Sequence, residues 1–150
     1  VAVQTACTPD GTYVFATLYD TKEVVRYDIA TKKLDRVALP GGAQGPVQRY
    51  PSPDSATLWV CDQGLLEGRP ASNKLFRVDA AKLQISGVVE VGSGAHGVVV
   101  SDDGALAYVT NLADNTVSVV DTAAMKEIAT VPVGTKPNGI SHWHRSGGMP

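Results

Sequence analysis

The apolar residues of this chain fall into short runs that are separated by polar turns. Towards the end of the sequence these runs are rich in Val, Tyr and Thr, which β-strands favour, and they cover residues 97–101, 106–110, 116–120 and 126–133. Asp103-Gly104 and Asp121-Thr122 stand between runs, and such pairs suit tight turns because their side chains and backbones tolerate the required conformations. No segment has the period of an amphipathic helix. The pattern predicts four short antiparallel strands.

The same unit occurs three times, in segments 8–34, 52–83 and 101–128. Each unit has a turn aspartate and a strand-end aspartate, which form the pairs Asp10 and Asp28, Asp54 and Asp79, and Asp103 and Asp121. The members of these pairs are 18, 25 and 18 residues apart. The second unit therefore carries seven extra residues, which fall within 64–72. This stretch contains Gly, Pro and Ser, and we expect it to be a surface loop, where extra length costs little.

Four antiparallel strands that recur about every 42–50 residues are typical of β-propeller blades. The sequence predicts an all-β chain with blade 1 at about 1–46, blade 2 at about 47–97, blade 3 at about 98–139 and the start of a fourth blade at about 140–150. The apolar content of all the strands fits blades that are buried on both faces by their neighbours. Propellers have 4–8 blades. We therefore expect this chain to be a fragment of a longer protein or to close a ring with other chains.

Charge and hydropathy exclude two classes of partner. The formal net charge is −2, and the 13 basic residues are scattered, whereas a nucleic-acid binder shows clustered Lys and Arg. No apolar stretch approaches the roughly 20 residues that span a bilayer. We expect neither a nucleic-acid partner nor a membrane span.

The third unit closely resembles the YVTN family of β-propeller repeats. The resemblance rests on residues 108–111 (YVTN), 115–122 (NTVSVVDT) and 131–134 (VPVG), and on 94–98 and 136–140, which lead into inner strands. It implies a seven-bladed ring, to which these three blades and the first strand of a fourth would belong. It also implies a periplasmic or extracellular location.

The loops that lead into the inner strands give the first candidate site. His96 stands just before an inner strand, Asn138 occupies the matching position in the next repeat, and Gln44 lies near it in the first. In a propeller these residues would face the mouth of the central channel, where they could bind a ligand. The alternative is that each is a polar loop residue that bonds the local backbone.

A second candidate is a metal site at His142 and His144. Residues i and i+2 of a strand project from one face, and His96 of the neighbouring blade could supply a third imidazole. Histidine is a common metal ligand, but a structural metal site wants about four ligands. The alternative is an ordinary polar strand. No cofactor is certain from the sequence.

Three functions are left open. The first and favoured one is a non-enzymatic binding or scaffold module, whose partner is another protein or the remaining blades of the same propeller. The second is a cofactor-holding propeller, because similar propellers house the copper centre of nitrous oxide reductase or the d1-type haem of nitrite reductases. The third is a propeller lyase or lactonase, because residues 95–97 resemble the Gly-His-Gly motif of streptogramin lyase-like propellers. The recurring aspartates are interpreted as turn formers, and no catalytic motif appears.

Overall fold

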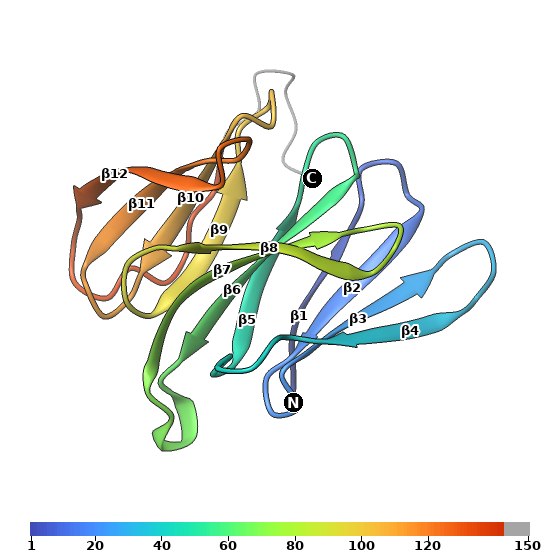
Figure 1. Cartoon of the computed structure of the whole chain (residues 1–150), viewed down its shortest axis with the longest axis horizontal. Coiled ribbons are helices and arrows are strands. Elements are labelled where there is room, and N and C mark those ends of the chain that lie inside the picture. The colour runs from blue at the N-terminus through green and yellow to red at the C-terminus, as the bar shows by residue number, and fades with distance from the viewer. Residues whose placement is uncertain (143–150) are drawn as a thin grey trace.

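The computed structural model describes residues 1–142 and consists of three antiparallel sheets of four strands (Figure 1). This confirms the prediction of four-stranded propeller blades. Blade 1 comprises β1 (Ala2–Cys7), β2 (Tyr13–Leu18), β3 (Glu23–Asp28) and β4 (Leu34–Ala38); blade 2 comprises β5 (Pro46–Pro51), β6 (Thr57–Gly64), β7 (Ala71–Asp79) and β8 (Gln84–Glu90); blade 3 comprises β9 (Ala95–Val100), β10 (Leu106–Asn111), β11 (Thr116–Asp121) and β12 (Lys126–Pro132). The insertion in blade 2 contains a short 3-10 helix, η1 (Leu66–Gly68).

The strands of each blade pair in sequence order, so that every blade is a meander. The first strands lie side by side, because β1 contacts β5 and β5 contacts β9. The blades fan out from these inner strands, with β9–β12, β5–β8 and β1–β4 following one another across Figure 1. Within residues 1–142, no helix is long and apolar enough to cross a membrane.

The core lies between the blades. On β6 the side chains alternate, because successive residues of a strand point to opposite faces: Leu58 and Val60 join a cluster with Phe15 of blade 1, whereas Trp59 and Cys61 join a cluster that includes Val109 of blade 3. The second strand of blade 2, β6, is thus buried on both faces, with only its first residue partly exposed. Large apolar side chains at both ends of the arc are exposed, among them Val3, Ile128 and Val131.

One hydrogen-bonded turn follows the inner strand of every blade. The hydroxyl of Thr8, Ser52 or Ser101 donates to the aspartate two residues later and accepts the backbone N–H five residues later. That aspartate also accepts the N–H two residues beyond itself. The strand-end aspartates accept backbone N–H groups of the turns that follow them. Both sets have the contacts of turn-forming residues.

These turns make the fold sensitive to acid. Hydrogen bonds, first of all from the Thr or Ser hydroxyl, hold the pKa values of Asp10, Asp54 and Asp103 below their usual 3.8. The turns therefore make their full contribution to the free energy of unfolding above pH 3.8. This contribution is lost as the pH falls through the lowered pKa values. We expect the triple Asp→Asn variant to show a flatter decline in unfolding free energy between about pH 5 and pH 2, measured by urea unfolding. An unchanged decline would contradict this.

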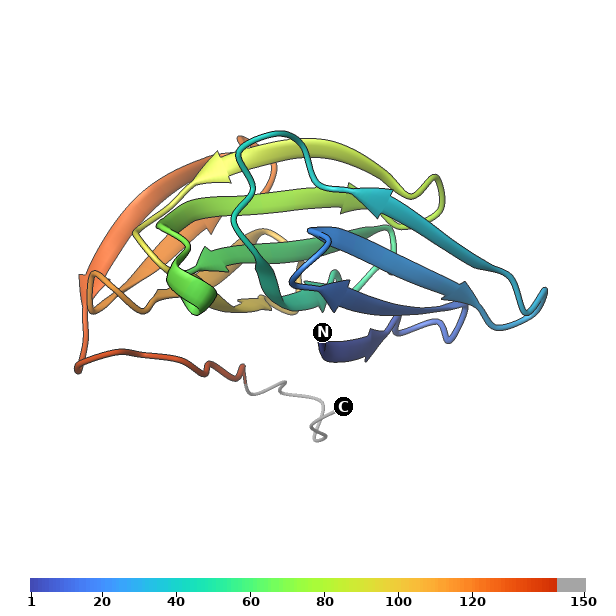
Figure 2. The same cartoon turned by 90° about the horizontal axis from the view of Figure 1, so that it is seen from below.

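The predicted first strand of a fourth blade lies only partly within the described residues. Residues 140–142 form no strand, and His144 lies outside the described residues. A strand needs a ladder of hydrogen bonds with a partner, and within residues 1–142 no second strand of that blade is present. The segment after β12 instead runs back beneath the inner strands (Figure 2). There Gln48 Nε2 donates to the carbonyl of Asn138 at 3.4 Å.

Candidate functional site

The connections that lead into the inner strands lie beside those that join the second and third strands of each blade. Backbone hydrogen bonds link them in blades 1 and 3: Leu39 N donates to Lys22 O, Leu112 N to Gly94 O, and Val133 N to Asn115 O. We call the surface formed by residues 19–22, 39–45, 64–70, 91–94, 112–115 and 133–138 the loop face. The insertion of blade 2 extends from it as the green loop at the bottom of Figure 1.

A buried carboxylate fixes the middle of the loop face. Asp62, near the end of β6, is fully buried and accepts N–H bonds from Gln44 at 3.0 and 2.9 Å and from Gly45 at 2.6 Å. In blade 3 the same register position holds Asn111, because Pro46 pairs with Asp62 as Ala95 pairs with Asn111. Sequence reasoning did not single out Asp62. Its signal is a charged residue inside an otherwise apolar strand, which must find partners when it is buried.

Two side chains clamp the insertion onto blade 1. Arg69 Nη1 donates to the carbonyls of Tyr19 and Gln44 at 3.1 and 2.9 Å, and its guanidinium lies 4.7 Å from the centre of the Tyr19 ring. The Tyr19 hydroxyl donates to Leu66 O and accepts from Leu66 N, both at 3.1 Å. Burial raises the pKa of Tyr19, so the hydroxyl stays protonated and can serve as donor. A Cβ at Gly45 would lie 2.1 Å from the Tyr19 ring, so glycine is needed there.

The clamped loop presents two apolar side chains at its tip. Leu65 is 37% exposed and Leu66 is 49% exposed. Leu65 and Glu67 have φ values of 66° and 54°, in the left-handed region that costs a non-glycine residue about 1–3 kcal/mol. Left-handed residues also occur in the short connecting turns, for example Lys22 and Asn115, so it is the exposure of the leucines on a fixed loop that marks a candidate contact surface.

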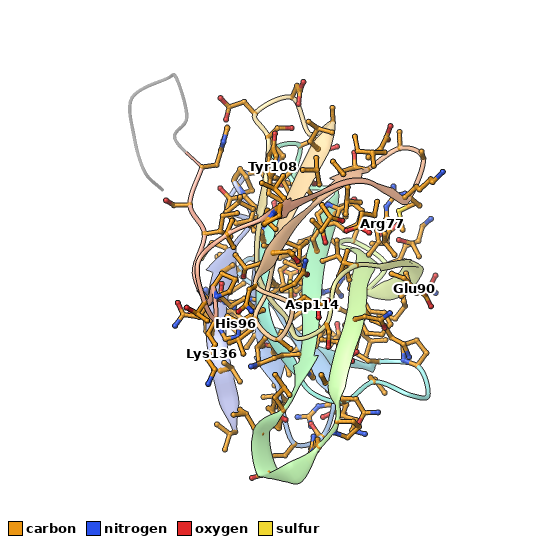
Figure 3. All side chains as sticks on the ribbon, turned by 90° about the vertical axis from the view of Figure 1, so that its left-hand side faces the viewer. Arg77, Glu90, His96, Tyr108, Asp114 and Lys136 are labelled. Carbon is orange, nitrogen blue, oxygen red and sulfur yellow. The ribbon has the colours of Figure 1, made fainter. Side chains whose placement is uncertain are left out.

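The three predicted channel-mouth residues make separate contacts. His96 on β9 is half-buried (labelled in Figure 3); its buried Nδ1 has no partner among residues 1–142, and burial lowers its pKa. The Gln44 side chain donates to Gly42 O at 3.1 Å. Asn138 is joined to Gln48 through its backbone carbonyl. No hydrogen bond of the described residues connects these three side chains.

The strand register gives a different alignment for Gln44. Gly45 O accepts from Gln63 N as Gly94 O accepts from Leu112 N, so the two glycines are equivalent. Gln44 then corresponds to Ser93, and it is Val47 that takes the position of His96. The residue of blade 2 that is equivalent to His96 is therefore apolar.

The predicted metal ligands are only partly within the described residues. His142 Nε2 lies 3.4 Å from Asp102 Oδ1, and residue 142 is not in a strand. His144 falls outside the described range. Among residues 1–142, no three His, Cys, Asp or Glu side chains are grouped so that they could hold a metal ion.

A half-open cleft of about 540 Å³ lies between blades 2 and 3. Its lining includes Trp59, Arg77 and Asp54 from blade 2, and Asp102, Asp103 and Thr122 from blade 3. In the matching groove between blades 1 and 2, Arg26 closes the gap: it donates to the carbonyls of Ala80 and Ala81, pairs with Asp35 at 2.9 Å and lies over Tyr13.

Arg77 is the equivalent of Arg26, but the residues that contact Arg26 are replaced by smaller ones near Arg77. Its register partner on the outer strand is Gly87, where Arg26 has Asp35, and Thr57 replaces Tyr13. The Met125 side chain covers Gly87, since a Cβ there would lie 2.6 Å from its terminal carbon. The smaller Thr57 at the position of Tyr13 thus contributes to the cleft, and the two interblade grooves are not equivalent.

Comparison with known proteins supports the fold. Among solved structures, the chain is similar to hydrazine synthase of Kuenenia stuttgartiensis, with a TM-score of 0.77 and 26% identity over 90% of this chain and 37% of that one. The chain forms β-propeller blades. Similar folds also occur in a candidate 6-phosphogluconolactonase of Bacteroides fragilis (TM-score 0.71, 19% identity, 92% and 40% covered) and in the WD40 repeats of RRP9 (TM-score 0.73, 16% identity, 87% and 38% covered).

These propeller blades span well under half the length of the solved structures that they resemble. No family model matches the sequence, and no curated protein matches it. The similarity to YVTN repeats therefore stays a resemblance of motifs.

Proposed function

We propose that this chain is part of a non-enzymatic propeller module that binds a protein partner through the loop face. The observation that carries the proposal is the clamped insertion, which holds Leu65 and Leu66 in exposed positions while Arg69 and Tyr19 fix its base. A preorganised apolar contact loses little conformational entropy on binding, so most of its burial contributes to affinity. The similarity to WD40 propellers supports a binding role at the level of fold.

The same proposal explains the exposed apolar side chains at both ends of the arc as surfaces that further blades cover. Val3 on β1 and Ile128 and Val131 on β12 are exposed, and they would be covered by the remaining blades of the ring. Native mass spectrometry of the intact protein tests this part, because the measured mass shows whether enough blades are present to complete a ring. A periplasmic or extracellular location is proposed on the motif resemblance, and fractionation of cells that express the protein tests it.

Leu66→Asp is expected to weaken partner binding at least tenfold, because a buried charge replaces a central apolar contact. The partner is first identified with a photo-cross-linker at position 66 and then purified, and its Kd is measured by calorimetry. Val88→Asp is the matched control, because Val88 on β8 of the middle blade is 49% exposed, as Leu66 is, and lies outside both the loop face and the ends of the arc. Equal affinity of the Leu66→Asp variant and the wild type would exclude the loop tip as the contact.

A further inference from the structure

Arg49 is a buried cation between two inner strands. It lies on β5 opposite Val60, whose side chain belongs to the cluster between blades 1 and 2, and it is only 3% exposed. Its Nη1 donates to Gln4 Oε1 of β1 at 2.6 Å. Its Nε and Nη2 are buried and have no hydrogen-bond partner among residues 1–142.

The positive charge of Arg49 also has no negatively charged partner among residues 1–142. Burial lowers the pKa of its guanidinium to about 10, so the group is still cationic at neutral pH. No carboxylate of the described residues pairs with it, whereas Arg26 uses both terminal nitrogens on Asp35 and two carbonyls. A buried ion without a counter-charge is strongly unfavourable. A counter-ion that enters this position would therefore be bound with a considerable gain.

The position is close to solvent on the side of β1. Gln4, which contacts Arg49, is exposed, and the pairing of β1 with β2 shifts its register between Ala2 and Thr5. Gln4 thus lies in the irregular part of the strand. Gln4 holds Nη1 through its Oε1 at this exposed edge, which leaves Nε and Nη2 as the free pair of the fork within the described residues.

We propose that Arg49 and Gln4 form a binding site for a small oxyanion, a carboxylate or a phosphate group, in the wall between β1 and β5. The planar fork of a guanidinium matches two oxygens of such an anion, and Nε with Nη2 is the pair that lacks partners. Gln4 orients the fork by accepting from Nη1. The site does not depend on the loop face or on its partner.

The test uses the whole chain and compares wild type with Arg49→Met. We expect the Tm of the wild type to rise saturably with sodium acetate or sodium phosphate at fixed ionic strength, because a ligand that binds only the folded state stabilises it. Arg49→Met should lose this rise, and Arg36→Met, which removes an exposed arginine on β4, should keep it. The anion that gives the effect distinguishes a carboxylate site from a phosphate site.

A second readout does not depend on how the variant folds. The Nε–Hε signal of Arg49 in the NMR spectrum of the wild-type chain should shift saturably with the same anion. Arg49→Lys, which keeps the charge but loses the fork, should bind at least tenfold more weakly. An equal Tm rise in Arg49→Met would mean a general salt effect, and it would overturn the proposal, as would an Nε–Hε signal that does not respond.

Discussion

Replacing Asp62 with alanine is expected to lower the free energy of unfolding by about 2–4 kcal/mol. The carboxylate is fully buried and receives the N–H groups of Gln44 and Gly45. Alanine would leave these two donors without an acceptor, and each buried donor without a partner costs about 1–3 kcal/mol. Urea unfolding of the whole chain measures the loss, and hydrogen exchange at Gln44 and Gly45 locates it.

Asp62→Asn is the matched variant for this experiment. It keeps one carbonyl oxygen as acceptor and is close to the Asn111 that blade 3 carries at the same register position. We therefore expect Asp62→Asn to lose less stability than Asp62→Ala and to protect the Gln44 amide partly. If the alanine variant is as stable as the wild type, Asp62 does not hold the loop face together.

The repeat made the blades predictable, because each strand and each turn is a local pattern. Thr8, Ser52 and Ser101 stand at one position of the unit, with an aspartate two residues later, and the structure gives all three the same hydrogen bonds. The insertion in blade 2 was also predictable, since the spacing of two aspartates located it. Its place between β6 and β7 agrees with that spacing.

Contacts between blades could not be predicted in the same way. Arg69 and Tyr19 are 50 residues apart in sequence, and Arg49 and Gln4 are 45 apart. Neither pair is repeated in the other blades, so no periodic signal marks it. The sequence places Gln44 near the repeat position of His96, whereas the backbone hydrogen bonds match Gly45 with Gly94 and therefore Gln44 with Ser93. Strand register decides such equivalences, and it becomes visible only in three dimensions.

The insertion offers a test of whether its backbone shape matters. Gly64 has a φ of +67°, and a Cβ there would lie 1.9 Å from the carbonyl oxygen of Pro70. Gly64→Ala is expected to lower the free energy of unfolding by about 3 kcal/mol, the sum of a left-handed alanine and an overlap with backbone that cannot move alone. The overlap would also break the hydrogen bond from Leu65 N to Pro70 O.

Gly68→Ala separates the two causes. Gly68 has a φ of +74°, but nothing lies within 4 Å of the added Cβ, so only the conformational cost of about 1–2 kcal/mol is expected. Urea unfolding gives both losses. Hydrogen exchange at the Leu66 amide, which donates to the Tyr19 hydroxyl, should become faster in Gly64→Ala than in Gly68→Ala. Equal losses in the two variants would mean that the loop relaxes around Pro70, and a loop that relaxes so easily would not hold Leu65 and Leu66 ready for a partner.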